Sequence, residues 1–157
     1  MPGRETPATR AARDAGVGFT VHEYDHDPRA ESYAGEAAEA LGVDPRRVFK
    51  TLVVGAGDDL VVCVVPAADQ LDLKRVGKRA AMADTARAER VTGYVAGGIS
   101  PLGQRRRLPT YVDETALEHA TVFVSAGRRG LEIEIAPADL VALTGAEVRT
   151  LRRAAVA

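Results

Sequence analysis

Lys50 is the ionisable residue with the most informative setting in the sequence. It interrupts an apolar, strand-like run from Val48 to Val54, in which Thr51 is the only other polar residue. A lysine on a strand that is buried on both faces must point into a polar cavity or pair with an anion, because an isolated buried charge is costly. A cation held there can bind a phosphate or polarise a carbonyl. For one residue alone, a solvated lysine on an outward-facing position is the simpler alternative.

A glycine-rich loop at residues 97–103 (GGISPLG) is a second candidate ligand site. Glycine lets a backbone approach a ligand closely and proline restrains the loop, so its N–H groups could hold an ester carbonyl or a phosphate oxygen. Segment 125–130 (SAGRRG) adds a hydroxyl and two arginines. An ordinary tight connection and a solvated charged face are the alternatives. Three further cations directly follow the loop and could contact phosphate: Arg105, Arg106 and Arg107.

Other common catalytic and metal-binding patterns are missing from the sequence. Cys63 lies in an apolar run (VVCVV), where a thiol behaves as a small hydrophobic group. On an extended strand His22 and His26 would lie on one side but about 13 Å apart, too far for one ion without a bend. His119 lies on another segment. There is no nucleophile elbow, P-loop or dinucleotide fingerprint. We expect no metal ion and no cofactor.

Charge and composition restrict the class of partner. The 157 residues include 21 Lys+Arg and 22 Asp+Glu, a formal net charge of −1, whereas a non-specific nucleic-acid coat usually has a basic excess. We expect no DNA partner and only local contacts with RNA. The longest apolar run, Leu60 to Pro66, is far shorter than the about 20 residues that span a bilayer. Because no secretory signal is present either, we expect a cytoplasmic protein without a membrane partner.

Turn and cap signals divide the chain into helices and hairpins. Helices are expected to begin at Thr6-Pro7, Ser32, Asp84 and Pro137 and to end at Gly16, Gly42, Gly93 and Gly145. Strands are expected at 19–24, 48–54, 60–65, 110–112, 121–125 and 131–135, with hairpin turns at 55–59 and 127–130. A weak helix is expected at 71–79, and the tail from Glu147 as an extra helical turn or a frayed end.

The arrangement of these elements favours one α+β domain over residues 1–157, with a mixed, mostly antiparallel sheet. Strands come in hairpins with helices between them, and no regular βαβ alternation appears. No linker, repeat or low-complexity segment divides the chain. On the last predicted strand, apolar side chains alternate with Glu132 and Glu134, which therefore face the other side of the strand.

Three ordered motifs resemble the YbaK/EbsC family of bacterial aminoacyl-tRNA deacylases, which is related to the editing domain of prolyl-tRNA synthetase. The motifs are FKTL at 49–52, GYVAGGISPLG at 93–103 and FVSAGRRGLEIEIAPADL at 123–140. The likeness extends over residues 6–146, and the branch that acts on Cys-tRNA(Pro) is the most similar. It implies a β-barrel-like sheet surrounded by short helices. Segment 74–82 departs from the family pattern, being shorter than the usual helix and basic strand.

The resemblance also implies the residues of the site. The family lysine falls on Lys50, and the family G-x-x-x-P loop falls on Gly97, Gly98, Ile99, Ser100 and Pro101. Pocket residues of the family fall on Tyr24, Tyr33, Ser125, Gly127 and Asp139.

The family mechanism, as the resemblance implies it, needs no protein nucleophile. The cysteine thiol of the substrate attacks its own ester and leaves as a thiolactone, while the loop amides hold the carbonyl and Lys50 holds the terminal phosphate or ester oxygen. Arg105, Arg106 and Arg107 would contact the acceptor stem of tRNA(Pro), with prolyl-tRNA synthetase as a further candidate partner. Two alternatives are a deacylase that uses water on Ala- or Ser-charged tRNA, and a non-catalytic module that binds tRNA or the synthetase.

Overall fold

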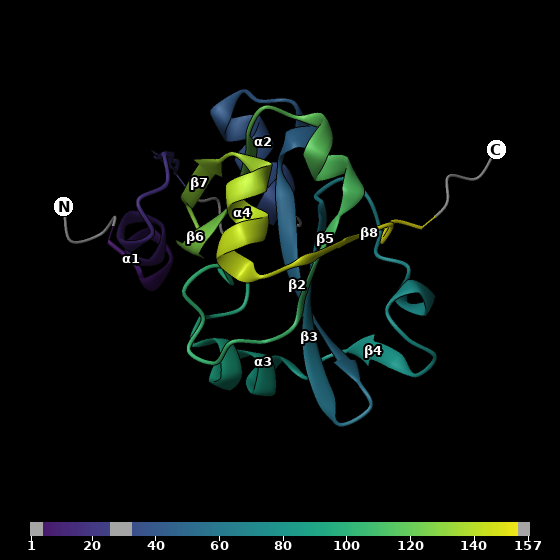
Figure 1. Ribbon diagram of the computed structural model, residues 1–157. Helices are drawn as coiled ribbons and strands as arrows, with labels where there is room; N and C mark the ends of the chain where they lie inside the picture. The colour runs from purple at the N-terminus through teal and green to yellow at the C-terminus, as the bar shows by residue number, and fades with distance from the viewer. Residues whose placement is uncertain (1–4, 26–32, 154–157) are drawn as a thin grey trace.

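The computed structural model describes residues 5–25 and 33–153, which form an α+β fold (Figure 1). The α-helices are α1 (Pro7–Asp14), α2 (Tyr33–Leu41), α3 (Thr85–Thr92) and α4 (Pro137–Thr144), and the short 3-10 helices are η2 (Pro45–Arg47), η3 (Leu73–Arg75) and η4 (Glu114–Glu118). The strands are β1 (Phe19–Glu23), β2 (Phe49–Ala56), β3 (Asp59–Pro66), β4 (Ala80–Met82), β5 (Thr110–Asp113), β6 (Val122–Arg128), β7 (Leu131–Ile135) and β8 (Glu147–Arg149).

The strands form two sheets, with the orders β1-β7-β6 and β4-β2-β3-β5-β8. Both predicted hairpins are present as antiparallel pairs, β2–β3 and β6–β7, while β3–β5 and β5–β8 are parallel. A single parallel bridge between Val48 and Phe123 connects the two sheets. The predicted class, α+β with mostly antiparallel pairing, is confirmed. In place of the expected barrel-like sheet, the strands form two sheets that do not close into a barrel.

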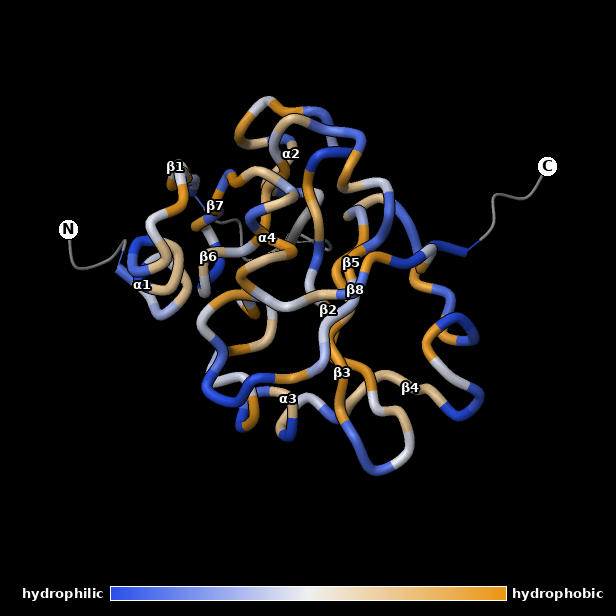
Figure 2. Tube along the Cα trace, in the orientation of Figure 1, coloured by the Kyte–Doolittle hydropathy of each residue, from blue (hydrophilic) through white to orange (hydrophobic). Residues whose placement is uncertain are grey.

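The main core lies where both sheets and the helices α1, α3 and α4 meet, and a smaller one covers the other face of β2 and β3. β3 is therefore buried on both faces, which explains why Leu60 to Pro66 is a continuous apolar run. Figure 2 shows this hydrophobic strand next to its hydrophilic turn. Cys63 belongs to the smaller core, where burial raises the pKa of its thiol to about 12.

The helix boundaries follow the caps seen in the sequence. Thr6 and Asp84 each accept a hydrogen bond from a backbone N–H of the first turn, and Gly93 and Gly145 end α3 and α4 in the left-handed conformation. The start predicted for α2 at Ser32 lies outside the described residues.

Two segments differ from the prediction because tertiary pairing decides their structure. The tail from Glu147 is not helical but forms β8, an edge strand parallel to β5. The buried carboxylate of Asp113 anchors the chain just beyond β8, since it accepts hydrogen bonds from the N–H groups of Leu151 (2.8 Å) and Arg152 (3.2 Å). In segment 71–79 only Leu73–Arg75 is helical, and the chain then enters β4, which pairs with the end of β2.

No helix among the described residues is long and apolar enough to cross a membrane.

Candidate active site

A cavity of about 390 Å³ opens beside β2 and receives residues from five parts of the chain. Its walls are β2, the residue after β1, the segment from β4 to α3, the loop after α3, and the β6–β7 hairpin. The lining residues are Tyr24, Phe49, Lys50, Thr51, Leu52, Val53, Met82, Ala83, Thr85, Ala88, Ala96, Gly97, Ile99, Ser125, Arg129 and Glu132.

The position of the cavity follows from the separation of the two sheets. β2 and β6 are neighbours at the Val48–Phe123 bridge, and two residues further along each strand, Lys50 and Ser125 both line the cavity. β4 pairs with β2 only from Val54 onward, and the N–H of Ala83 donates to the carbonyl of Val53 (3.0 Å), so in the described structure no strand pairs with this edge of β2 at residues 49–52. Since consecutive residues of a strand point to opposite faces, a cavity lined by all of residues 49–53 must lie along this edge.

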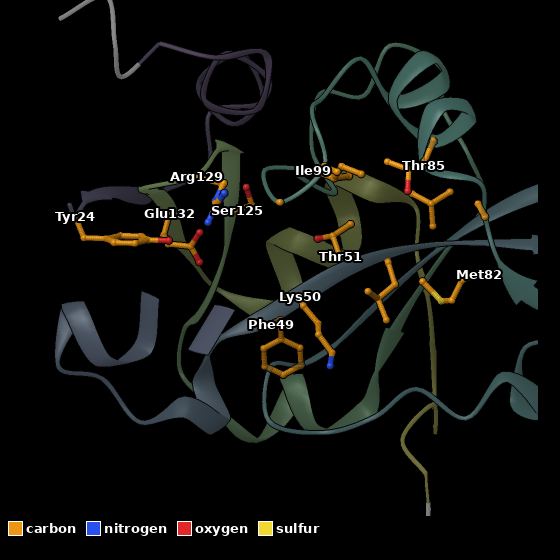
Figure 3. A pocket seen from close by; sticks show the side chains of 16 residues that line it. Tyr24, Phe49, Lys50, Thr51, Met82, Thr85, Ile99, Ser125, Arg129 and Glu132 are labelled. Carbon is orange, nitrogen blue, oxygen red and sulfur yellow. The ribbon is translucent and has the colours of Figure 1, made fainter. Parts of the chain in front are cut away.

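Lys50 is half-buried at this edge, and no ion pair or hydrogen bond holds its ammonium within the described part of the chain. Burial lowers the pKa of Lys50, with a smaller opposing effect of Asp69. Lys50 and Thr51 leave β2 in opposite directions, and Thr51 points toward Ile99 (Figure 3). The hydroxyl of Thr51 is buried without a hydrogen-bond partner. Both side chains therefore retain polar groups that a ligand can use.

The glycine-rich loop contributes two of its five predicted residues to the cavity, Gly97 and Ile99. Their N–H groups donate to no acceptor in the described residues, whereas the N–H of Gly98 donates to the carbonyl of Val95 (2.9 Å). Ser100 is fully buried, and its hydroxyl accepts from the N–H of Leu102 (3.2 Å). Of the predicted loop amides, those of Gly97 and Ile99 are thus available to hold an oxygen atom.

Two close approaches fix this loop. A Cβ on Gly98 would lie 2.6 Å from the Cα of Arg128, so the loop packs directly against the β6–β7 turn. The hydroxyl of buried Tyr94 donates to the carbonyl of Leu102 (2.6 Å), and the ring leaves no room for a side chain at Gly127. Gly98 and Gly127 therefore shape the loop and do not themselves line the cavity. Pro101 lines a separate, smaller cavity of about 160 Å³.

The other end of the cavity is polar and contains Tyr24, Ser125, Arg129 and Glu132 (Figure 3). Burial, and secondly the nearby Glu132, raise the pKa of Tyr24 to about 12, so its phenol is neutral. The hydroxyl of Ser125 accepts from the N–H of Gly127 (3.1 Å). Tyr24 and Ser125, which the sequence predicted as pocket residues, thus line the cavity.

Glu132 is a pocket residue that the sequence analysis missed. Its alternation with Glu134 correctly predicts the face of β7, but on that face Ala37 and Ala38 of α2 pack with Phe123 of the neighbouring β6, and Glu132 is only 6% exposed. Burial raises its pKa to about 8. One sequence signal pointed to Glu132. A hairpin with its turn at 127–130 places Glu132 opposite Ser125 on the neighbouring strand, as the structure has it.

Several predicted site residues lie elsewhere. Asp139 is in the first turn of α4 and does not line the cavity. Tyr33 begins α2, and its side chain lies outside what the structure describes. The remaining three are exposed beyond the loop: Arg105, Arg106 and Arg107.

The histidines show no arrangement for a metal ion in the described residues. No group of three potential ligands occurs there. His22 hydrogen-bonds to Glu134 (2.9 Å), which also accepts from Arg47 and Thr121. His26 lies outside the described residues.

Comparisons with known proteins identify the family of this chain. Residues 27–143 match the aminoacyl-tRNA editing domain family. The chain is 41% identical over 120 residues, 73% of each chain, to the "Putative Cys-tRNA(Pro)/Cys-tRNA(Cys) deacylase EbsC" of Enterococcus faecalis. It is 32% identical over 110 residues to the uncharacterized protein YwhH of Bacillus subtilis, covering 67% of this chain and 70% of that one. A solved structure of "a putative trans-editing enzyme for prolyl tRNA synthetase" superposes with a TM-score of 0.84 at 30% identity, covering 96% of this chain and 99% of that one.

The fold and these matches together define a protein that edits aminoacyl-tRNA. The chain belongs to the aminoacyl-tRNA editing domain family, which confirms the resemblance seen in the sequence. Its enzyme class is aminoacyl-tRNA deacylase, since editing of an aminoacyl-tRNA is the cleavage of its ester bond.

Proposed function

We propose that this protein deacylates mischarged Cys-tRNA(Pro) and that the cysteine thiol of the substrate is the nucleophile. The observation that carries the proposal is a cavity equipped to position an ester but not to attack one. It offers a cation at Lys50 and two available amides at Gly97 and Ile99. No hydroxyl that lines it is hydrogen-bonded to a basic side chain within the described residues. The name of the Enterococcus relative supports cysteine as the amino acid.

The proposed step conserves every atom of the substrate. The thiol sulfur forms a bond to the ester carbonyl carbon, the bond from that carbon to the ribose 3′ oxygen breaks, and the thiol proton ends on that oxygen. The products are a cysteine thiolactone and tRNA with a free 3′ hydroxyl. The amides of Gly97 and Ile99 stabilise the charge that develops on the carbonyl oxygen, and Lys50 holds the terminal phosphate or the ester oxygen.

The remaining parts of the proposal concern the tRNA body. Arg105, Arg106 and Arg107 are exposed directly after the loop, where their guanidinium groups would contact acceptor-stem phosphates. With a net charge of −1, the free protein would bind tRNA weakly, and prolyl-tRNA synthetase would be the partner that brings the correct tRNA. The protein would act in the cytoplasm, where both are found.

A deacylation panel tests the proposed function. tRNA(Pro) charged with Cys, Ala, Ser or Pro is incubated with the wild-type protein, Lys50→Ala and the control Lys78→Ala, an exposed lysine outside the cavity. We expect cleavage of the Cys ester alone, a loss of about 100-fold in kcat/KM for Lys50→Ala, and no loss for Lys78→Ala. Cleavage of none of the four would point to the binding-module alternative. Wild-type activity in Lys50→Ala would remove the role given to that lysine.

A further inference from the structure

Glu132 is a buried carboxyl group that the proposed mechanism does not use. Its side chain comes from the central strand of the β1-β7-β6 sheet and lines the polar end of the cavity beside Tyr24 and Ser125 (Figure 3). It forms no hydrogen bond or ion pair within the described residues, and burial alone accounts for its raised pKa. Its neighbour Glu134 contrasts with it, since His22, Arg47 and Thr121 all contact that carboxylate. A buried acid without a partner is costly for a fold, so a ligand is the remaining candidate partner.

The charges of the cavity and of the substrate identify that ligand group. Among the described residues that line the cavity, Glu132 is the one acidic residue, and Lys50 and Arg129 are the basic ones. An aminoacyl ester at the 3′ end of tRNA carries negative phosphates and a single cationic group, the α-ammonium of the amino acid. The two basic residues suit the phosphates and the ester oxygens, whereas Glu132 offers the one anionic partner in the described part of the lining. Resting on the proposed function, we propose that Glu132 binds the α-ammonium group of the aminoacyl ester.

The buried position makes this recognition selective. An ammonium at hydrogen-bond distance stabilises the ionised carboxylate, and low exposure to water strengthens a charge-assisted hydrogen bond. An N-acylated ester, such as peptidyl-tRNA, has no ammonium group and carries a bulkier amide in its place. Glu132 thereby lets the enzyme remove a free amino acid while it spares a growing peptide. Neutral Tyr24 lies beside the carboxyl and supplies polar lining without competing charge.

Paired substrates and paired variants test this role. Rates of deacylation are measured for Cys-tRNA(Pro) and N-acetyl-Cys-tRNA(Pro) with the wild-type protein, Glu132→Gln and Glu134→Gln. We expect the wild-type protein to prefer the free amine by at least about 30-fold in kcat/KM, and Glu132→Gln to prefer it by less than about 3-fold. Glu134→Gln, altered on the same face of the same strand but outside the cavity, should keep the wild-type preference. A merely structural role for Glu132 would lower both rates equally and leave the ratio unchanged, which would overturn the proposal.

Binding separates this proposal from the proposed function. Affinities are measured by calorimetry for a non-hydrolysable 3′-amide of cysteine and adenosine monophosphate and for its N-acetyl form. We expect the wild-type protein to bind the free amine more tightly and Glu132→Gln to bind both alike. That result would support Glu132 as the ammonium site even if the deacylation panel showed no cleavage. Equal wild-type affinity for the two compounds would overturn it even if Cys-tRNA(Pro) were cleaved, and that result needs no variant to fold.

Discussion

At the scale of single residues, Glu132 makes the stability of the fold depend on pH. Its pKa of about 8 lies above the usual value of 4.5, so the folded state binds the proton more tightly than the unfolded state. The stabilisation is fully present below about pH 4.5 and is lost as pH rises toward 8. We expect the free energy of unfolding of Glu132→Gln, relative to wild type, to increase between pH 5 and pH 8 by at most about 1.4 kcal/mol per pH unit. Urea unfolding of both proteins at several pH values measures this difference in the free energy of unfolding.

The matched control is Glu39→Gln, a change of the same kind at an exposed position of α2. Its free energy of unfolding should follow that of the wild-type protein across the pH range. Parallel curves for wild type and Glu132→Gln would show that Glu132 is ionised in the folded state throughout, contrary to our account.

Lys50 and Glu132 show what the sequence can reveal about single residues. Lys50 interrupts an apolar strand, so its charge is conspicuous, and the structure places it at a cavity as predicted. Glu132 alternates with apolar residues beside Glu134, a pattern that solvent-facing acids also produce. The face of the sheet that carries it also packs with α2, whose Ala37 and Ala38 contact the cluster of Phe123 about a hundred residues away in the chain. No local pattern records that contact, and therefore the residue was missed.

At the scale of elements, the loop after α3 is held in place by its contact with the β6–β7 turn. We expect Gly98→Ala to push the loop away from the turn, because the new Cβ would lie 2.6 Å from the Cα of Arg128 and 3.0 Å from its carbonyl carbon. A shift of about 1 Å in the amides of Gly97 and Ile99 should lower kcat/KM for Cys-tRNA(Pro) by about 100-fold. Steady-state kinetics measure the effect.

Gly18→Ala is the control for this loop prediction. No atom lies within 4 Å of a Cβ at Gly18, and its φ is not positive. It should leave kcat/KM unchanged. Equal activity of the Gly98→Ala and wild-type enzymes would mean that the packing of the loop does not position its amides.

Elements with local signals were predictable and those with distant partners were not. Thr6, Asp84 and Gly93 mark helix ends by side-chain and backbone chemistry within a few residues, and the structure confirms them. β8 forms because Asp113 and β5 lie in place to receive the chain after α4. That segment has the composition of a polar tail, so its strand is visible only in the fold.

At the scale of the whole molecule, the exposed arginines after the loop should provide the salt dependence of the reaction. Replacing Arg105, Arg106 and Arg107 with Gln should reduce the slope of log(kcat/KM) against log[salt] by about 2 to 3, if each contacts one phosphate. Measurements on Cys-tRNA(Pro) between about 50 and 200 mM salt test this. The slope is expected to change because each contact between an arginine and a phosphate releases the counterions of that phosphate.

A second triple variant controls for charge alone. Arg10, Arg13 and Arg46 are also exposed and form ion pairs with Glu5 or Asp44 far along the chain from the loop. Their replacement with Gln changes the net charge equally and should leave the slope near the wild-type value. Equal slopes for both triple variants would place the acceptor stem on another surface.

The cavity itself is a property of the whole fold. Two sheets that touch at Val48 and Phe123 and then separate leave one edge of β2 at residues 49–52 without a strand partner in the described structure. Of the sixteen described residues that line this opening, the sequence predicted five as site residues, Tyr24, Lys50, Gly97, Ile99 and Ser125, because each lies on or beside a recognisable strand or loop. Which of the predicted site residues reach the cavity depends on how the two sheets diverge, and Asp139 and Pro101 lie outside it. The sequence of no single segment encodes this divergence.

The central claim is that the thiol of the substrate supplies the nucleophile. The most direct measurement is the ratio of kcat/KM for Cys-tRNA(Pro) to that for Ser-tRNA(Pro), two esters that differ by one atom. Because a neutral hydroxyl is a far weaker nucleophile than a thiol that is partly ionised near neutral pH, we predict a ratio of at least about 100. A ratio near 1 would show that water attacks both esters and would contradict the account.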